Sequence, residues 1–378
     1  MTLPLLLFFL SCSLSMGAGW TRLDTTMTDG RWAPSAALLA DGRTALIAGG
    51  YSYAARRCVA SADLFDETAR RFRPCRGRMN AERDFATATA LPSGRVLIAG
   101  GFNTHTGTLD TAEIYDPLTE QFRPLPSRLS CGRELFQATS LRDGRVLLTG
   151  GLDLWTGRTQ NTADLFDPKT EKFTPTASAM MNDRFGHAAV RLADGRVLIV
   201  GGKSVILGQS ETFLASAEIF DPGTGRFHPT KSPMHVARDR PTASLLPDGT
   251  ALIAGGQDGD QTPRLAELFD PKTERFTSLP APLLTPRMAH ADVLTPSGQV
   301  LLAGGWSAPT QTTLDAVELY DPLTRAFHAA PALPDATFDA ALIVFPDGLV
   351  LSAGGKQAGN GKEISLASGA VWQAGKTP

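Results

Sequence analysis

A pair of adjacent glycines recurs seven times along the 378 residues and constrains the fold more than any other feature. Successive pairs are 49 to 54 residues apart, so a module of about fifty residues is repeated. Repeated modules that pack on their neighbours form one body rather than several domains. We therefore predict a single domain over residues 20–378. The pairs begin at Gly49, Gly100, Gly150, Gly201, Gly255, Gly304 and Gly354.

The second module shows the internal pattern most clearly. Two segments, residues 83–91 (RDFATATAL) and 95–101 (RVLIAGG), flank a Ser-Gly pair, and a Ser-Gly or Asp-Gly pair between apolar segments is a strong signal for a β-hairpin. Residues 111–116 (TAEIYD) and 121–124 (QFRP) follow, on either side of a turn that contains proline. Each module is therefore predicted to contain four antiparallel strands.

These features together closely resemble the kelch repeat, over residues 20–374. The shared features are the glycine pair that ends the second strand, the acidic, aliphatic and aromatic residues of the third strand, and an aromatic residue on the fourth. The resemblance implies an all-β, seven-bladed β-propeller of four-stranded antiparallel blades, with the first strand of each blade beside a central channel. The fourth-strand aromatic residues are Phe72, Phe122, Phe173, Phe227, Phe276 and Phe327.

Two segments compete to close the ring, which must hide its first and last edges. Residues 20–39 align without gaps with residues 122–141, which puts Trp20 at the aromatic position of a fourth strand. At the other end, Glu363 matches a third strand and Trp372 falls at the outer aromatic position. We expect the N-terminal strand to close the ring. A stack of the two tryptophans in an extended outer edge is the alternative.

The N-terminal segment differs in composition from the repeats. Residues 3–10 are apolar and small residues follow, so we interpret residues 1–19 as an export signal. The mature chain is then expected in the periplasm, on the outer surface or secreted. Residues 9–12 (FLSC) resemble a lipoprotein signal with Cys12 as the lipidated residue, and a cleaved or a lipidated signal both stay open.

The charge of the chain limits the classes of partner, and its cysteines suggest a disulfide. The formal net charge is −2 and no basic run interrupts the repeats, so we exclude nucleic acid as a partner and expect membrane contact only through a lipid anchor. An oxidising compartment permits a disulfide. Of Cys58, Cys75 and Cys131, we expect Cys58 and Cys75 to be bridged, because their loop and strand end are neighbours in the first module.

The loops between second and third strands lie on the same face as the connections between modules. This face has the greatest variation in loop length, and loops on a rigid scaffold commonly carry function. Exposed aromatic side chains around a mouth suit sugars or peptides, although they can also pack against neighbouring loops. The predicted ligand-binding residues of these loops are Tyr51, Phe102, Trp155, Lys203 and Trp306.

An arginine precedes the glycine pair by seventeen residues in five modules and by eighteen in the first, where it is Arg31, while Thr337 replaces it in the seventh. These arginines either form a ring at the channel mouth that binds a carboxylate, or pair with a third-strand acid inside each blade. Next to them, Asp84 and Glu134 vary between modules and are further ligand-binding candidates. The five arginines are Arg83, Arg133, Arg184, Arg238 and Arg287. The third-strand acids are Asp63, Glu113, Asp164, Glu218, Glu267, Glu318 and Glu363.

The sequence favours a binding scaffold over an enzyme. His187 and His290 lack a ligand partner at metal spacing, so we expect neither a metal nor another cofactor. We expect a monomer that recognises a protein or a glycan through the loop face and catalyses no reaction. Kelch propellers also include a copper-dependent galactose oxidase, whose tyrosine, histidine and cysteine motif is not recognisable here, and a sialic-acid mutarotase. The mutarotase type needs an arginine and a carboxylate in a polar pocket, so it stays open as the alternative.

Overall fold

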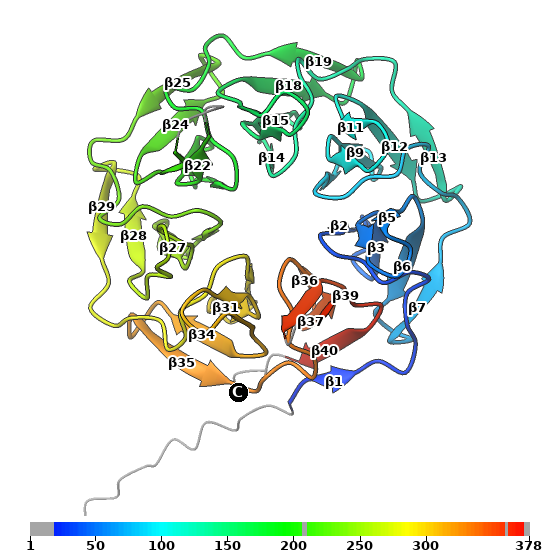
Figure 1. Ribbon diagram of the computed structural model, residues 1–378. Helices are drawn as coiled ribbons and strands as arrows, with labels where there is room; N and C mark the ends of the chain where they lie inside the picture. The colour runs from blue at the N-terminus through cyan, green and yellow to red at the C-terminus, as the bar shows by residue number, and fades with distance from the viewer. Residues whose placement is uncertain (1–18, 206–209, 360–361, 374–378) are drawn as a thin grey trace, which may run out of the picture.

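The computed structural model describes residues 19–205, 210–359 and 362–373, and all regular elements in those ranges are β-strands. Seven four-stranded antiparallel sheets are arranged radially around a central channel (Figure 1). The chain is therefore a seven-bladed β-propeller, which confirms the predicted fold class. Residues 1–18 lie outside the described residues, so the expected export signal and the expected lipidation at Cys12 are not seen.

The strands of each blade follow one another outward from the channel. Blade 1 contains β2 (Ser35–Leu38), β3 (Thr44–Ala48), β6 (Ala62–Asp66) and β7 (Arg71–Pro74); blade 2 contains β8 (Thr87–Ala90), β9 (Val96–Ala99), β12 (Ala112–Asp116) and β13 (Gln121–Pro124); blade 3 contains β14 (Gln137–Ser140), β15 (Val146–Thr149), β18 (Ala163–Asp167) and β19 (Lys172–Pro175); blade 4 contains β20 (Ala188–Arg191), β21 (Val197–Val200), β24 (Ala217–Asp221) and β25 (Arg226–Pro229). Blade 5 contains β26 (Thr242–Leu245), β27 (Ala251–Ala254), β28 (Glu267–Asp270) and β29 (Arg275–Ser278); blade 6 contains β30 (Ala291–Leu294), β31 (Val300–Ala303), β34 (Val317–Asp321) and β35 (Ala326–Ala330); blade 7 contains β36 (Ala341–Val344), β37 (Leu349–Ala353), β40 (Gly369–Gln373) and β1 (Thr21–Arg22).

Burial explains why the second strand of each blade is apolar on both sides. Every residue of β9 is fully buried, because a blade is covered by its neighbours on both faces. The glycine pair that follows joins two blades: the Gly101 amide donates to the Arg133 carbonyl of blade 3 at 2.9 Å. A Cβ on Gly100 would lie 2.7 Å from that carbonyl oxygen, and both glycines have positive φ, so no other residue fits there.

The N-terminal strand closes the ring, as predicted. Thr21 and Arg22 of β1 pair with Val371 and Ala370 of β40, which places Trp20 at the fourth-strand aromatic position. Its ring stacks on Trp372 at 6.3 Å between centroids, as Phe122 lies against Tyr115 in blade 2 at 4.8 Å.

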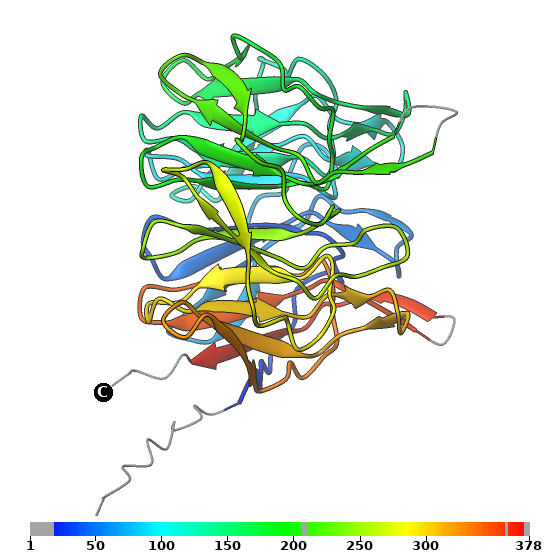
Figure 2. The same ribbon diagram turned by 90° about the vertical axis from the view of Figure 1, so that its left-hand side faces the viewer.

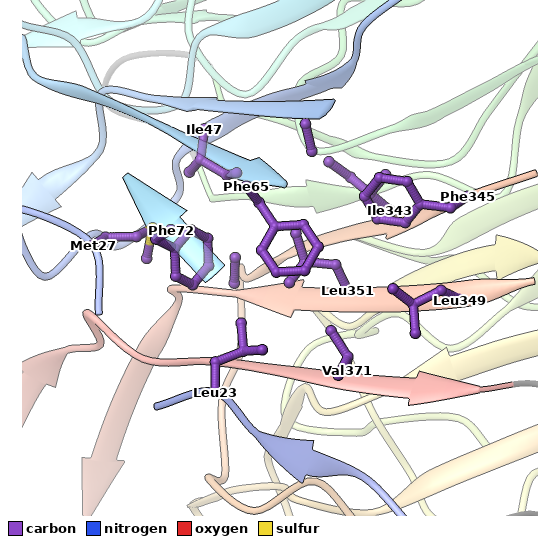
Figure 3. Packing of buried hydrophobic residues seen from close by; sticks show 12 residues of the cluster. Leu23, Met27, Ile47, Phe65, Phe72, Ile343, Phe345, Leu349, Leu351 and Val371 are labelled. Carbon is purple, nitrogen blue, oxygen red and sulfur yellow. The ribbon is translucent and has the colours of Figure 1, made fainter. Parts of the chain in front are cut away.

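The side chains beyond β1 close the joint between blades 7 and 1. Leu23 and Met27 pack with Phe65 and Phe72 of blade 1 and with Val371 of blade 7 (Figure 3). The first blade is thus fastened to the last by a buried apolar cluster as well as by strand pairing.

The competing assignment of the C-terminus is wrong. The third strand of blade 7 is β40, which contains Trp372, whereas Glu363 belongs to a separate hairpin formed by β38 (Lys356–Gly359) and β39 (Lys362–Ser365). The two tryptophans do stack, but across the third and fourth strands of blade 7 rather than in an additional outer edge.

The predicted Cys58–Cys75 disulfide is also wrong, because both thiols are free in the structure. Cys58 ends β5 (Arg57–Cys58) and accepts a hydrogen bond from Thr104 of blade 2 at 3.1 Å. Cys75 follows the outermost strand of blade 1, where its sulfur lies 3.8 Å from the Tyr115 hydroxyl. The two sulfurs therefore face different parts of blade 2.

Among the described residues, no helix is long and apolar enough to span a bilayer.

Candidate functional site

Small two-stranded hairpins project from one face of the propeller, toward the right in Figure 2. They follow the glycine pairs, and we call this the hairpin face; the opposite face, where the first strand turns into the second and the third into the fourth, is the turn face. The hairpins are β4 (Tyr51–Ser52) with β5, β10 (Phe102–Asn103) with β11 (Gly107–Thr108), β16 (Leu152–Asp153) with β17 (Arg158–Thr159), β22 (Lys203–Ser204) with β23 (Thr212–Phe213), β32 (Trp306–Ser307) with β33 (Thr312–Thr313), and β38 with β39.

The repeat arginines lie inside the blades, not at the channel mouth. All six have no exposed surface. Arg184 is typical: it donates to the Gly201 carbonyl at 2.7 Å and to the Glu218 carboxylate at 2.9 Å. The predicted ligand-binding role of Arg83, Arg133, Arg184, Arg238 and Arg287 is therefore wrong, because each guanidinium group is enclosed in its own blade and paired with an acid there. The pairs are Arg31–Asp63, Arg83–Glu113, Arg133–Asp164, Arg184–Glu218, Arg238–Glu267 and Arg287–Glu318.

Blade 7 lacks both members of this pair. Thr337 replaces the arginine, and its hydroxyl donates to the Gly354 carbonyl at 3.1 Å, which keeps one of the arginine's hydrogen bonds. Ala370 replaces the acid, since it pairs with Ser352 as Glu113 pairs with Ile98 in blade 2. The prediction that Glu363 takes this place is wrong: its carboxylate lies on the hairpin face, 2.7 Å from the Lys356 ammonium.

Two residues after each arginine or its threonine replacement, the chain adopts a left-handed backbone conformation in every blade, with φ between 46° and 63°. The seven residues surround the channel just below the hairpin face, and we call them the collar. Five collar amides donate to the collar carbonyl of the preceding blade, for example Gly186 to Leu135 at 2.8 Å. The collar consists of Ala33, Phe85, Leu135, Gly186, Arg240, Ala289 and Asp339.

The collar side chains line a channel cavity of about 450 Å³. Arg240 forms an ion pair with Asp339 of blade 7, and its guanidinium lies over the Phe85 ring of blade 2, 5.7 Å from the centroid. The Trp32 indole donates to the other oxygen of Asp339 at 2.8 Å. One arginine therefore reaches across the channel and links the walls formed by blades 2, 5 and 7.

Three carboxyl groups lie directly above the collar. Asp84, Glu134 and Asp239 each follow a repeat arginine, and their side chains are at most 5% exposed. Burial raises the pKa of Asp84 to about 7, with the Asp339 charge adding to it and hydrogen bonds from Cys58 and backbone amides opposing it.

The pKa values of the other two acids are raised for the same main reason. Burial raises the pKa of Glu134 to about 8, and the charges of Asp84 and Asp153 add to that rise. Burial also raises the pKa of Asp239 to about 6, although the charges of Arg240 and Lys203 limit the rise. The mouth thus holds carboxyl groups that change charge near neutral pH.

Two lysines at the mouth contact aromatic rings and carboxylates. The Lys356 ammonium lies 4.6 Å from the Trp32 ring centroid, 5.0 Å from that of Tyr53 and 5.6 Å from that of Phe338. The Lys203 ammonium lies over Phe185 and Phe213 at 5.3 and 5.7 Å. It also contacts Glu211 at 3.0 Å and Asp239 at 3.7 Å. Each cation is held by ring faces together with a carboxylate.

The structure brings the sequence-predicted loop residues together around this mouth. Tyr51, Phe102, Lys203 and Trp306 each form a backbone bridge with the residue that follows the arginine position of their blade. Trp155 lies further out on the β16–β17 hairpin, with 81% of its surface exposed.

Sequence reasoning missed Arg240, Asp339 and Lys356. For Arg240 and Asp339 the available signal is the variation between modules two positions after each arginine or its threonine replacement. For Lys356 it is the position directly after the glycine pair, which Lys203 also occupies.

The channel residues do not form a metal site. His187 bonds Thr149 at 2.9 Å and His290 bonds Thr242 at 3.0 Å, each through Nε2. Burial holds the pKa of both imidazoles well below its usual range, so they are neutral wall residues. The described part of the chain contains no group of three or more His, Cys, Asp or Glu side chains arranged to hold a metal ion.

A closed ring of seven such blades defines the chain as a β-propeller, and the sequence comparison finds a known repeat motif in one of them. Residues 87–128, which span the four strands of blade 2, match the kelch motif. No curated protein matches the chain in sequence.

Among 936 solved chains that match the structure is a fungal alcohol oxidase of the AA5 family in complex with copper. It is 17% identical, with a TM-score of 0.71 over 95% of this chain and 76% of the oxidase chain. At that identity the likeness concerns the fold alone.

Proposed function

We propose that this propeller is a binding module that recognises a protein or a glycan through the mouth of its hairpin face and catalyses no reaction. The supporting observation is that residues which build the blades repeat, whereas residues around the mouth differ from blade to blade. The position after the arginine holds Trp32, Asp84, Glu134, Phe185, Asp239, Met288 and Phe338. Its bridge partner is Tyr51, Phe102, Leu152, Lys203, Gln257, Trp306 or Lys356.

A rigid ring that presents different side chains at equivalent places suits recognition of one ligand shape. Blades 1 and 7 contribute a continuous aromatic wall. In it, the ring centroid of Trp32 lies within 6.4 Å of the ring centroids of Tyr51, Tyr53 and Phe338. Such ring faces bind sugar rings and peptide side chains at little entropic cost. With the proposed export signal, the ligand is a component of the envelope or of the exterior.

The test is a glycan array together with a pull-down from the native envelope, using purified residues 20–378. Trp155→Ala removes an exposed side chain of the hairpin face, and Leu118→Ala, which is 93% exposed on the turn face, is the matched control. We expect about tenfold weaker capture with Trp155→Ala and unchanged capture with Leu118→Ala. Loss confined to the Leu118 variant would refute the hairpin face as the binding surface.

A second candidate, sugar mutarotation or epimerisation, is favoured by one observation. Glu134 and Asp239 lie within reach of the Arg240 charge at a cavity mouth, and carboxyl groups with pKa values near neutrality suit general acid–base catalysis. NMR exchange between the anomers of an acidic sugar tests it. Catalysed exchange that is lost in Glu134→Gln would support this candidate over the binding module.

A further inference from the structure

We infer that the ligand carries an organic cation, an ammonium or guanidinium group, which binds at the mouth between Asp84 of blade 2 and Glu134 of blade 3. The inference rests on the proposed binding function and specifies its ligand chemistry. It replaces the alternative of a ring of arginines that binds a carboxylate, since those arginines are enclosed in the blades.

The pairing of buried carboxyl groups supports this site. Among the described residues, ten aspartate and glutamate side chains are buried. Eight of them lie within ion-pair distance of a lysine or arginine: Asp63, Glu113, Glu120, Asp164, Glu218, Asp239, Glu267 and Glu318. Asp84 and Glu134 are the other two. These two lie on adjacent blades, and by exposed surface they are the buried carboxyl groups of the described ranges without a lysine or arginine at ion-pair distance. Asp292 of the channel wall is partly exposed and accepts a hydrogen bond from the Ser244 hydroxyl instead.

The two carboxyl groups have hydrogen-bonding and charge-pairing groups left free for a ligand. Asp84 Oδ1 is buried without a hydrogen-bond partner in the described structure. Asp84 has the Cys58 thiol as a hydrogen-bond donor and Asp339 as a charged neighbour, and the charged neighbours of Glu134 are Asp84, Asp153 and Arg240. Arg240, the positive group of that set, is already paired with Asp339. Two neighbouring carboxyl groups without a counter-ion are costly, and binding a cation would remove that cost.

At three other places around the mouth, a cation of the chain itself contacts both an aromatic ring and a carboxylate, which is the arrangement that the ligand would complete. Lys203, Arg240 and Lys356 each lie over an aromatic ring and within ion-pair distance of a carboxylate. The sector of blades 2 and 3 has the carboxyl groups and the rings of Phe102 and Trp155, but no cation of its own at ion-pair distance from Asp84 or Glu134. The Trp155 ring leans over blade 2, where a Cβ on Gly107 would lie 3.1 Å from it.

Titration calorimetry of residues 20–378 with Nα-acetyl-lysine amide tests the site directly, with the neutral Nα,Nε-diacetyl-lysine amide as the paired ligand. Glucosamine and N-acetylglucosamine form the second pair, so the two arms separate a polypeptide source from a sugar source. We expect each cationic probe that binds to exceed its acetylated form by about tenfold or more in affinity. Affinity for the lysine probe should rise between about pH 6 and about pH 9 as the carboxyl groups lose their protons.

The variant for this test is the double replacement Asp84→Asn with Glu134→Gln, and exposed Asp24→Asn on the outer rim is the matched control. We expect the double variant to lose the preference for the cation and its pH dependence, while the control keeps both. A folded double variant that binds the cationic probes as tightly as the parent would overturn the inference. So would equal binding of charged and acetylated probes; if that binding is still lost in Trp155→Ala, the proposed function stands without its cationic ligand.

Discussion

The six buried arginines act as joints within their blades. Each bonds the carbonyl of the glycine pair and an acid two strands away, with no exposed surface. A guanidinium has five donors in a fixed plane, which explains why one residue type can tie these groups together in six blades. The sequence shows the spacing of these arginines and a matching acid in the third strands, which favoured pairing. It does not show the direction of the side chains, so a ligand-binding ring stayed open as the alternative.

Blade 7 provides a natural control for the contribution of this pair to stability. Arg287→Thr alone should lower the free energy of unfolding by about 3–5 kcal/mol, because Glu318 would stay buried without a counter-ion. Arg287→Thr with Glu318→Ala reproduces the residues of blade 7, Thr337 and Ala370, and should recover much of the loss. Chemical denaturation measures both. Equal destabilisation by the single and double variants would show that the unpaired Glu318 charge is not the cause of the lower free energy of unfolding.

Asp84 and Glu134 directly follow a repeat arginine, whereas the paired acids lie on the third strands, and their surroundings hold no lysine or arginine at ion-pair distance. The sequence marked both as variable next to an arginine, but it could not show that they are buried without a cation, since that depends on residues from other blades such as Asp339 and Asp153. The collar residue Arg240 was missed for the same reason, because its partner Asp339 lies 99 residues away in sequence.

At the scale of elements, regular repeats were predictable and irregular connections were not. The four strands per blade follow from hairpin turns and burial patterns that recur locally. Glu363 was misplaced because the acid-aliphatic pattern of a third strand also occurs in the β38–β39 hairpin, which inserts before β40. Only the pairing of β37 with β40 separates the two assignments.

The two-residue strand β1 needs its flanking side chains to close the ring. Leu23 and Met27 are buried in the cluster between blades 7 and 1 (Figure 3). We expect Leu23→Ala to lower the free energy of unfolding by about 2–5 kcal/mol, through lost contacts and the cavity left behind. Leu323→Ala, at a turn where the side chain is 93% exposed, should change it by less than about 0.5 kcal/mol. Thermal unfolding of the two variants measures this difference. Similar unfolding midpoints for Leu23→Ala and Leu323→Ala would contradict closure of the ring by β1.

For the whole molecule, the mouth acids predict that stability falls as pH rises above neutrality. The pKa values of Asp84 and Glu134 are raised in the folded state, so their contribution is fully present below about pH 4 and is lost as pH rises to about 7 and about 8. His187 and His290 have lowered pKa values and act oppositely, but only below about pH 6.5.

The window from about pH 6.5 to about pH 9 therefore isolates the acids. Over that window the melting temperature of the parent chain should fall, and in Asp84→Asn with Glu134→Gln it should fall less. An identical slope in parent and variant would mean that these carboxyl groups ionise as they do in the unfolded chain.

Recognition through the mouth of the hairpin face, as proposed, is tested most directly by a comparison of the two faces. Capture of ligands from native envelope extract by the parent, Trp155→Ala and Leu118→Ala should show loss for the hairpin-face variant and none for the turn-face variant. The reverse pattern, with the turn-face variant alone losing its ligand, would contradict the central claim that the mouth of the hairpin face is the binding site.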